Sequence, residues 1–360
     1  MRTYLDHNAT SPLRPEVKQA MLAALDVVGN ASSVHGEGRT ARKLMDDARE
    51  ALAINLGCLP QMITFTSGGT EANNMALRGV AVERILVSAI EHPCVLEAAK
   101  TSGKPVEIIS VDDQGHVDLD TFEKMLVGPK ALVSVMLANN ETGVIQDLNA
   151  IAELTHKAGH VLHVDAVQAF GKIPVNFGLL GVDMLTVAAH KVGGPKGIGA
   201  LVIRDGLVVD ALLQGGGQEL RRRAGTENIV AIAGFGALAA LDKIDCGDLT
   251  DLLHVGLEGA TIFSNRRARL SNTTCFAMEG MTAETALMNF DLEGIAASSG
   301  SACSSGKVGR SHVLDAMGVA PAISATAIRV SLGWNTTQED IQHFIAVWRK
   351  LNQRSKAKAA

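Results

Sequence analysis

Lys191 and Cys303 are the two side chains whose surroundings best suit covalent chemistry. Lys191 lies between an apolar run and a glycine-rich turn in AAHKVGGPKG. An amine withdrawn from water there can have a lowered pKa and form a Schiff base with a carbonyl group, although a solvated loop lysine also fits these letters. Cys303 stands among small polar residues in SSGSACSSG. A thiol there is accessible, as a nucleophile must be; an incidental loop cysteine is the alternative.

Two other segments could bind charged groups of a ligand. Asp165 ends an apolar run in HVDAVQ, so its carboxylate can either hold a protonated ring nitrogen or cap the helix that follows. The segment TFTSGGTEANN, residues 64–74, has the pattern of a strand, a glycine turn and a helix start. Backbone N–H groups at a helix N-terminus bind phosphate and other anions, although a glycine turn that only leads into an ordinary helix is the alternative.

Apolar runs of strand length alternate with helix-length segments over the first two thirds of the chain. Strands are predicted at 62–65, 85–88, 106–111, 131–137, 161–164, 184–187 and 199–203. Helices are predicted at 15–25, 40–56, 70–80, 92–101 and 149–158, with a polar loop at 29–38. This alternation predicts an α/β fold with a wound, largely parallel and buried sheet.

Polar residues follow several of these strands directly. They are residues 66–70, Glu91 and His92, Asn139 and Asn140, Asp165, and His190 and Lys191. In wound sheets, ligands bind in the crevice beyond the carboxyl ends of the strands. We therefore expect these residues to assemble into one site.

The pattern changes near residue 245. The later part has fewer regular strand–helix units, with strand candidates at 273–278 and 328–332, a Ser/Gly-rich loop at 298–309 and a helix at 337–353. We predict a large domain over 14–245. A smaller α+β domain, formed by 1–13 and 246–360, is expected to carry the Cys303 loop.

The composition excludes several classes of protein. The 360 residues are 47% hydrophobic and 20% charged, which argues against disorder. The net charge of −5 gives no support for a nucleic-acid or anionic-membrane partner. No apolar run reaches the roughly 18 residues that cross a bilayer. The five cysteines are an odd number with no two close together, which argues against a disulfide framework. We expect a cytoplasmic protein without nucleic-acid or membrane partners.

Three histidines lie close together in the sequence, at His156, His160 and His163. Such spacing could suggest a metal cluster. Because Gly159 is expected to end the helix between the first two, we predict structural roles for these histidines and no metal site.

Taken together, the motifs resemble those of one enzyme family. They are YLDHNAT, SSVHGEGR, FTSGGTEANN, EHPCVLEA, NNETGVIQD, HVDAVQ, AHKVGGPKG, GGGQELRRRAGT, SSGSAC and IRVSLG, in this order across residues 4–333. The series is similar to that of cysteine desulfurases, pyridoxal 5′-phosphate (PLP) enzymes of the class V aminotransferase family with the fold type I architecture. The form S-x-G-S-A-C resembles the NifS/IscS-like branch.

The resemblance implies roles around the cofactor. Lys191 would carry PLP as a Schiff base and move protons, and Asp165 would pair with the pyridine nitrogen. Gln168 would hydrogen-bond the phenolic oxygen, and His92 would stack on the ring and act as an acid–base group. The implied phosphate ligands are Gly69, Thr70 and His190, joined by Thr226 of the partner subunit. This last contact implies a homodimer.

The resemblance also implies the substrate and the product. Asn140 and Arg329 would bind the carboxylate of L-cysteine, and Cys303 would attack its sulfur, which forms a persulfide and releases L-alanine. The expected partner is a sulfur acceptor or scaffold protein of iron–sulfur cluster assembly. Ala188 departs from the family motif S-x-H-K by lacking a hydroxyl, which predicts weaker PLP retention. A selenocysteine lyase, another PLP-dependent aminotransferase or lyase of this fold, and a non-catalytic binding protein remain alternatives.

Overall fold

The computed structural model describes residues 2–278, 280–299 and 310–359. Its largest sheet has seven strands. In chain order they are β2 (Ile63–Thr66), β3 (Arg84–Ser88), β4 (Val106–Ile109), β5 (Ala131–Met136), β6 (Val161–Asp165), β7 (Met184–Ala188) and β8 (Gly199–Ile203). Across the sheet the order is β2-β8-β7-β6-β5-β3-β4; β8 is antiparallel to both neighbours and the other neighbouring pairs are parallel. The predicted α/β fold with a mostly parallel sheet is confirmed.

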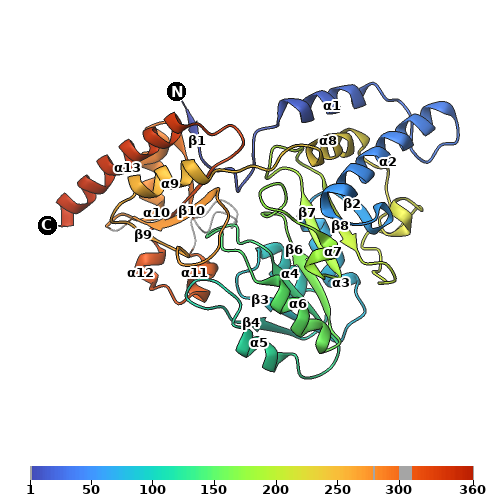
Figure 1. The fold of residues 1–360 in the computed structure, drawn as a ribbon, viewed down its shortest axis with the longest axis horizontal. Helices are drawn as coiled ribbons and strands as arrows, with labels where there is room; N and C mark the ends of the chain where they lie inside the picture. Colours follow the sequence, from blue (N-terminus) through green and yellow to red (C-terminus); the bar gives the residue numbers. More distant parts are fainter. Residues whose placement is uncertain (1, 279, 300–309, 360) are drawn as a thin grey trace.

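Helices pack on both faces of this sheet (Figure 1). They are α1 (Pro15–Leu25), α2 (Gly36–Leu56), α3 (Gly69–Gly79), α4 (Pro93–Lys100), α5 (Leu119–Met125), α6 (Leu148–Lys157), α7 (Phe177–Leu180) and α8 (Ile229–Ala239). Successive residues of a strand point to opposite faces. Leu132 therefore belongs to the core that contains α3 and α4, and its neighbour Val133 to the core that contains α2, α6 and α8.

Helix α2 begins four residues before the predicted start at residue 40. Residues 36–38, which were predicted to belong to the polar loop, are therefore the first residues of the helix. His35 is the N-cap residue, and its Nδ1 accepts a hydrogen bond from the Gly38 N–H group. A Cβ on Gly38 would lie 2.3 Å from the Ser33 carbonyl oxygen. The glycines that indicated a loop in the sequence therefore allow close packing at the start of a helix.

The C-terminal part of the chain forms a second, antiparallel sheet of four strands, in the order β12-β13-β10-β9. The strands are β9 (Thr261–Ile262), β10 (Thr273–Ala277), β12 (Ser298–Ser299) and β13 (Ala327–Ser331). Its helices are α9 (Gly247–Gly256), α10 (Ala283–Leu292), α11 (His312–Ala316), α12 (Pro321–Ser324) and α13 (Gln338–Ala359). The strands predicted at 273–278 and 328–332 and the final helix are confirmed.

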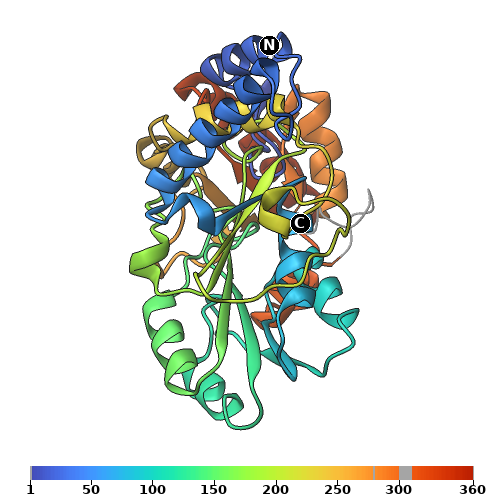
Figure 2. The same cartoon turned by 90° about the vertical axis from the view of Figure 1, so that its right-hand side faces the viewer.

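The N-terminal segment lies beside the C-terminal part of the chain (Figure 1 and Figure 2). Strand β1 (Thr3–Tyr4) pairs in parallel with β11 (Ile295–Ala296). The residues after β1 then run to the large sheet. There the Ser11 N–H group donates to the His190 carbonyl oxygen at 2.8 Å. Within the described ranges, none of the helices has the length and apolar character needed to span a membrane.

Candidate active site

Several of the predicted strand-end residues line one cavity of about 240 Å³, whereas residues 66–68, Glu91 and Asn139 do not line it. Gly69 and Thr70 follow β2, His92 follows β3, Asn140 follows β5, Asp165 ends β6 with Gln168 just beyond it, and His190 and Lys191 follow β7. The register explains why they meet: Met136 of β5 pairs with Asp165, and Asp165 pairs with Thr186 of β7. The carboxyl ends of these parallel strands therefore open onto the same crevice, as the topology requires.

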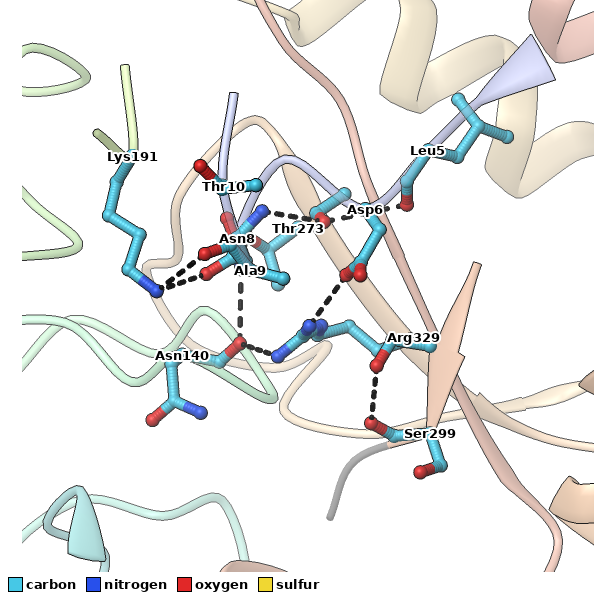
Figure 3. A network of polar contacts seen from close by, with 12 residues as sticks. Leu5, Asp6, Asn8, Ala9, Thr10, Asn140, Lys191, Thr273, Ser299 and Arg329 are labelled. Atoms are coloured by element: carbon cyan, nitrogen blue, oxygen red, sulfur yellow. Dashed lines mark hydrogen bonds and ion pairs between the residues drawn. The ribbon is translucent and has the colours of Figure 1, made fainter. Parts of the chain in front are cut away.

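Lys191 meets the N-terminal segment inside this crevice (Figure 3). Its Nζ donates to the carbonyl oxygen of Asn8 at 2.7 Å and to that of Ala9 at 3.1 Å. The Asn8 side chain is buried, and its Nδ2 donates to the Asn140 carbonyl oxygen at 3.1 Å and to Thr273 Oγ1 at 2.9 Å. Asn8 thus joins the lysine to the loop after β5 and to the second sheet, a role that the sequence pattern did not indicate.

Asp165 lies buried in the crevice and has two neutral partners. Its Oδ1 accepts from the Val167 N–H group at 2.9 Å, and its Oδ2 accepts from Asn73 Nδ2 at 2.7 Å. Burial raises the pKa of Asp165, and these two hydrogen bonds and Lys191 offset the shift in part. The capping alternative is wrong, because the residues that follow Asp165 form a turn and the next helix, α7, is capped by Asn176; Asp165 instead lines the cavity. A cationic ring N–H group placed there would stabilise the ionised carboxylate.

His92 is held as a neutral ring. Its Nδ1 accepts from the Cys94 N–H group at 3.2 Å as the N-cap of α4, and Cys94 Sγ lies 3.0 Å from the same nitrogen. Burial, Lys191 and His312 lower the pKa of His92 to about 4. With Nδ1 accepting, the single ring proton is on Nε2. Burial also raises the pKa of Cys94 to about 12, so this cavity-lining cysteine stays a thiol.

Cys94 and Asn73 are site residues that the sequence reasoning missed. Both line the cavity, and Asn73 Nδ2 also lies 3.2 Å from Cys94 Sγ. Their positions in the sequence could have indicated them. Asn73 lies one helical turn after the glycine turn, and Cys94 lies two residues after His92. The three clustered histidines lie outside this cavity and use their ring nitrogens elsewhere: His156 with Asp183, His160 with the Leu126 carbonyl oxygen, and His163 with Ser134 and Thr186.

The N-terminus of α3 lies at one end of the crevice. Its N-cap is Gly68, so no side chain caps the first N–H groups. The φ of 152° favours glycine at position 68, and glycine is needed at position 199 because a Cβ there would lie 2.7 Å from the carbonyl carbon of Gly68. A second cavity of about 460 Å³ adjoins this end and is lined by Thr10, Gly69, Thr70 and His190, among others. Exposed N–H groups with a helix dipole behind them suit a phosphate group.

Arg329 of β13 approaches the site from the second sheet. Its Nη1 donates to the Asn140 carbonyl oxygen at 3.1 Å, and its Nη2 forms an ion pair with Asp6 Oδ1 at 2.8 Å (Figure 3). The guanidinium is almost completely buried, and its Nε has no hydrogen-bond partner among the described residues. The structure therefore brings Arg329 next to Asn140, as predicted, and adds a carboxylate partner that was not predicted.

Among the described residues predicted for the site, Arg329 and Thr226 do not line the cavity. Thr226 is exposed and does not line either cavity, so its contact with a partner subunit stays a prediction. It follows the short helix η2 (Glu219–Arg221), whose three residues have φ values of 45°, 56° and 66°. Glu219 holds this left-handed turn through an ion pair with Arg49 at 2.7 Å. Cys303 lies outside the described residues.

The residues present fit pyridoxal phosphate. Asp165 offers a buried acceptor for a ring N–H group, the uncapped start of α3 offers donors for a phosphate, and Lys191 offers an amine for an aldehyde. Asn73 Oδ1 is buried without a hydrogen-bond partner among the described residues and belongs to a residue of the cavity wall. The crevice thus contains polar groups that a ligand with polar atoms would satisfy.

Comparisons with known proteins agree with this geometry. The family model described as aminotransferase class-V matches residues 3–344. A protein of Sinorhizobium fredii named cysteine desulfurase is 44% identical, with 96% of this chain and 95% of the relative covered. A protein of Dictyoglomus turgidum named cysteine desulfurase IscS is 40% identical, with 98% and 94% covered.

Solved structures agree as well. A NifS-like protein from Rickettsia africae has a TM-score of 0.90 and 37% identity, with 98% of this chain and 100% of that chain covered. The structure described as SspA in complex with cysteine has a TM-score of 0.83 and 30% identity, with 92% and 98% covered. The chain therefore belongs to the class V aminotransferase family, among the cysteine desulfurases of NifS and IscS type.

Proposed function

We propose that the protein is a PLP-dependent cysteine desulfurase. It converts L-cysteine and the Cys303 thiol into L-alanine and a persulfide on Cys303. The bond between carbon and sulfur in the substrate breaks, a bond between the two sulfur atoms forms, and a hydrogen replaces sulfur on the substrate carbon. The observation that carries this proposal is the single cavity that places Lys191, buried Asp165 and the uncapped N-terminus of α3 around one space.

PLP, when bound, supplies a conjugated ring that accepts electrons from the substrate. The chain's own residues prepare the space for it. Lys191 provides the amine that holds and releases the carbonyl group. Asp165 keeps a proton on the ring nitrogen, because a buried carboxylate with neutral partners favours a cation beside it. His92 presents a neutral ring with its proton on Nε2, which suits stacking and proton exchange.

Substrate recognition combines charge and position. Arg329 offers buried guanidinium N–H groups beside Asn140, which suit a carboxylate. The relative SspA has been solved in complex with cysteine, which supports L-cysteine as the substrate of this chain. Cys303 is expected to receive the sulfur.

The proposal extends to the protein's assembly and partners. We infer a homodimer in which Thr226 of the partner subunit contacts the phosphate; the exposure of Thr226 away from its own cavity supports this. A sulfur acceptor or scaffold protein of iron–sulfur cluster assembly then takes the persulfide sulfur in the cytoplasm.

The test is incubation of the PLP-loaded protein with L-cysteine, with separate detection of alanine and of protein persulfide. We expect one alanine for each persulfide formed. The Cys303→Ala variant should still bind PLP but form no persulfide, and Cys58→Ala serves as the control because Cys58 lies outside the cavity. Absence of alanine from the unaltered protein contradicts the activity, and undiminished persulfide in Cys303→Ala contradicts the role of that cysteine.

A further inference from the structure

Lys172 is a buried amine that the proposed mechanism does not use. Only 7% of its surface is exposed, and its Nζ donates to Gln168 Oε1 and to Asn8 Oδ1, both at 2.8 Å. None of the carboxylates in the described part of the chain forms an ion pair with it. Burial lowers the pKa of Lys172 well below its usual value, and Lys191 and Arg329 lower it further. A buried amine without a counter-charge lowers stability, which favours a functional reason for its presence.

Both oxygen atoms that Lys172 meets are fixed by other contacts. Asn8 Nδ2 donates to the Asn140 carbonyl oxygen, and Asn8 Oδ1 also accepts from Asn272 Nδ2 at 3.1 Å. Gln168 Nε2 donates to the Asn8 carbonyl oxygen at 3.0 Å, which turns Gln168 Oε1 toward Lys172. The amine therefore faces two acceptors, and each amide has one orientation that satisfies all its partners.

Lys172 reaches the catalytic lysine through these two side chains. With Oε1 bound by Lys172, the N–H groups of Gln168 face the Asn8 carbonyl oxygen and the cavity that Gln168 lines. The same Asn8 carbonyl oxygen accepts from Lys191 Nζ. One buried amine thus anchors both the amide that borders the cofactor space and the residue whose carbonyl binds Lys191.

We propose that Lys172 is a positioning residue of the active site, which holds the Gln168 N–H group toward the cofactor's phenolic oxygen and keeps the Asn8 carbonyl group against Lys191. This inference rests on the proposed function, because the phenolic oxygen belongs to PLP. A donor beside that oxygen stabilises its anionic form and weakens the hold of the oxygen on a proton at the Lys191 nitrogen. The other titratable groups around Lys191 are Asp165, His92 and His190.

The test compares Lys172→Met, which keeps an unbranched side chain one atom shorter and removes the donors, with Lys157→Met, a change at an exposed lysine of α6. Two quantities are measured: the dissociation constant of PLP and the pH midpoint of the visible absorption band of the loaded protein. We expect Lys172→Met to weaken PLP binding about tenfold and to raise the midpoint by about one pH unit. Lys157→Met should change neither quantity. A merely structural role would lower the melting temperature without moving the midpoint.

A double-mutant cycle with Gln168→Leu tests the route. If Lys172 acts through Gln168, Lys172→Met moves the midpoint less in the Gln168→Leu background than in the unaltered protein. Equal movement in both backgrounds, or no movement in either, overturns the inference. Should Lys172→Met not fold, Lys172→Gln takes its place with the same direction of change expected. Absence of a visible band from the unaltered protein overturns the proposed function and this inference together, whereas a band that Lys172 variants leave unchanged overturns the inference alone.

Discussion

The two sides of the crevice hold their buried charged groups in different ways. On the large sheet, Asp165 is bound by an amide and a backbone N–H group, and Lys172 by two amide oxygens. On the second sheet, Arg329 is bound by the carboxylate of Asp6 at 2.8 Å. The first arrangement leaves charge uncompensated, and the second compensates it within the protein.

This difference predicts how substitutions on each side affect activity and stability. A carboxylate with only neutral partners has a raised pKa and attracts a cation supplied by a ligand. A buried ion pair instead depends on both members, since removal of one leaves the other without a counter-charge. We therefore expect substitutions on the large-sheet side to change activity more than stability, and those at the Asp6–Arg329 pair to change stability as well.

The largest expected effect is that of Asp165→Asn on turnover. The variant keeps the shape and the hydrogen bond to Val167 but removes the charge that faces the cofactor space. Alanine formation should fall by about 10²–10³-fold, with no loss in melting temperature. Asp147→Asn is the matched control, because Asp147 Oδ1 likewise accepts a backbone N–H group but lies outside the cavity. A stable, fully active Asp165→Asn protein would contradict the comparison.

The next effect is that of Asp6→Asn on folding stability. The buried guanidinium of Arg329 loses its carboxylate partner, so the free energy of unfolding should fall by about 3 kcal/mol. Denaturant titration measures this quantity. Asp291→Asn removes the exposed pair with Arg2 and should leave the denaturation curve unchanged. Equal curves for Asp6→Asn and Asp291→Asn would show that Arg329 needs no counter-charge.

Glu141 lies between the two sides and gives a pH-dependent effect. Burial raises the pKa of this carboxyl to about 7, and the Ser311 hydroxyl and Arg329 offset the shift in part. A raised folded-state pKa contributes stability that is complete below the unfolded value of 4.5 and is lost as the pH rises through about 7.

Glu141→Gln should therefore equal the unaltered protein near pH 4.5 and exceed it in unfolding free energy by about 1–3 kcal/mol at pH 8. Denaturant titrations at a series of pH values measure the difference. A difference that does not change with pH would mean that folding does not shift the pKa of Glu141.

The smallest effect concerns Ala188, which lines the cavity without a polar atom to offer. Ala188→Ser adds the hydroxyl that the family motif provides near the phosphate. One added hydrogen bond should tighten PLP binding about 2- to 10-fold, as measured by equilibrium titration. Unchanged binding would indicate that the backbone donors of α3 already satisfy the phosphate.

Part of the large-sheet side of the site could be predicted from the sequence, because some of its residues follow a local apolar run. Asp165 ends a strand, and His92 and Lys191 each lie a few residues beyond the end of one. Parallel strands bring their carboxyl ends to one edge, so position along the chain was enough to infer proximity. The start of α2 was predicted wrongly, since Gly36 and Gly38 are typical of a turn but belong to a helix, where Gly38 allows close packing.

The other contacts could not be predicted, because they join residues with no local pattern in common. Asn8 and Thr273, for example, lie 265 positions apart. The ion pair of Asp6 and the buried position of Lys172 likewise depend on tertiary packing between the N-terminal segment and both sheets. The family resemblance pointed to Arg329 and Asn140. It did not point to Asp6, the carboxylate that Arg329 binds.

The path of the N-terminal segment sets the order in which the site can be completed during protein synthesis. Asp6 and Arg329 are separated by 323 positions, and Asn8 must meet Thr273 as well. At about 5–20 residues per second, a ribosome needs about 15–65 s to make the chain between them. A nascent chain can therefore contain Lys191 and Asp165 yet lack the far partners of the segment that contacts the lysine. We therefore expect the protein to bind its cofactor only after the ribosome has synthesised β13.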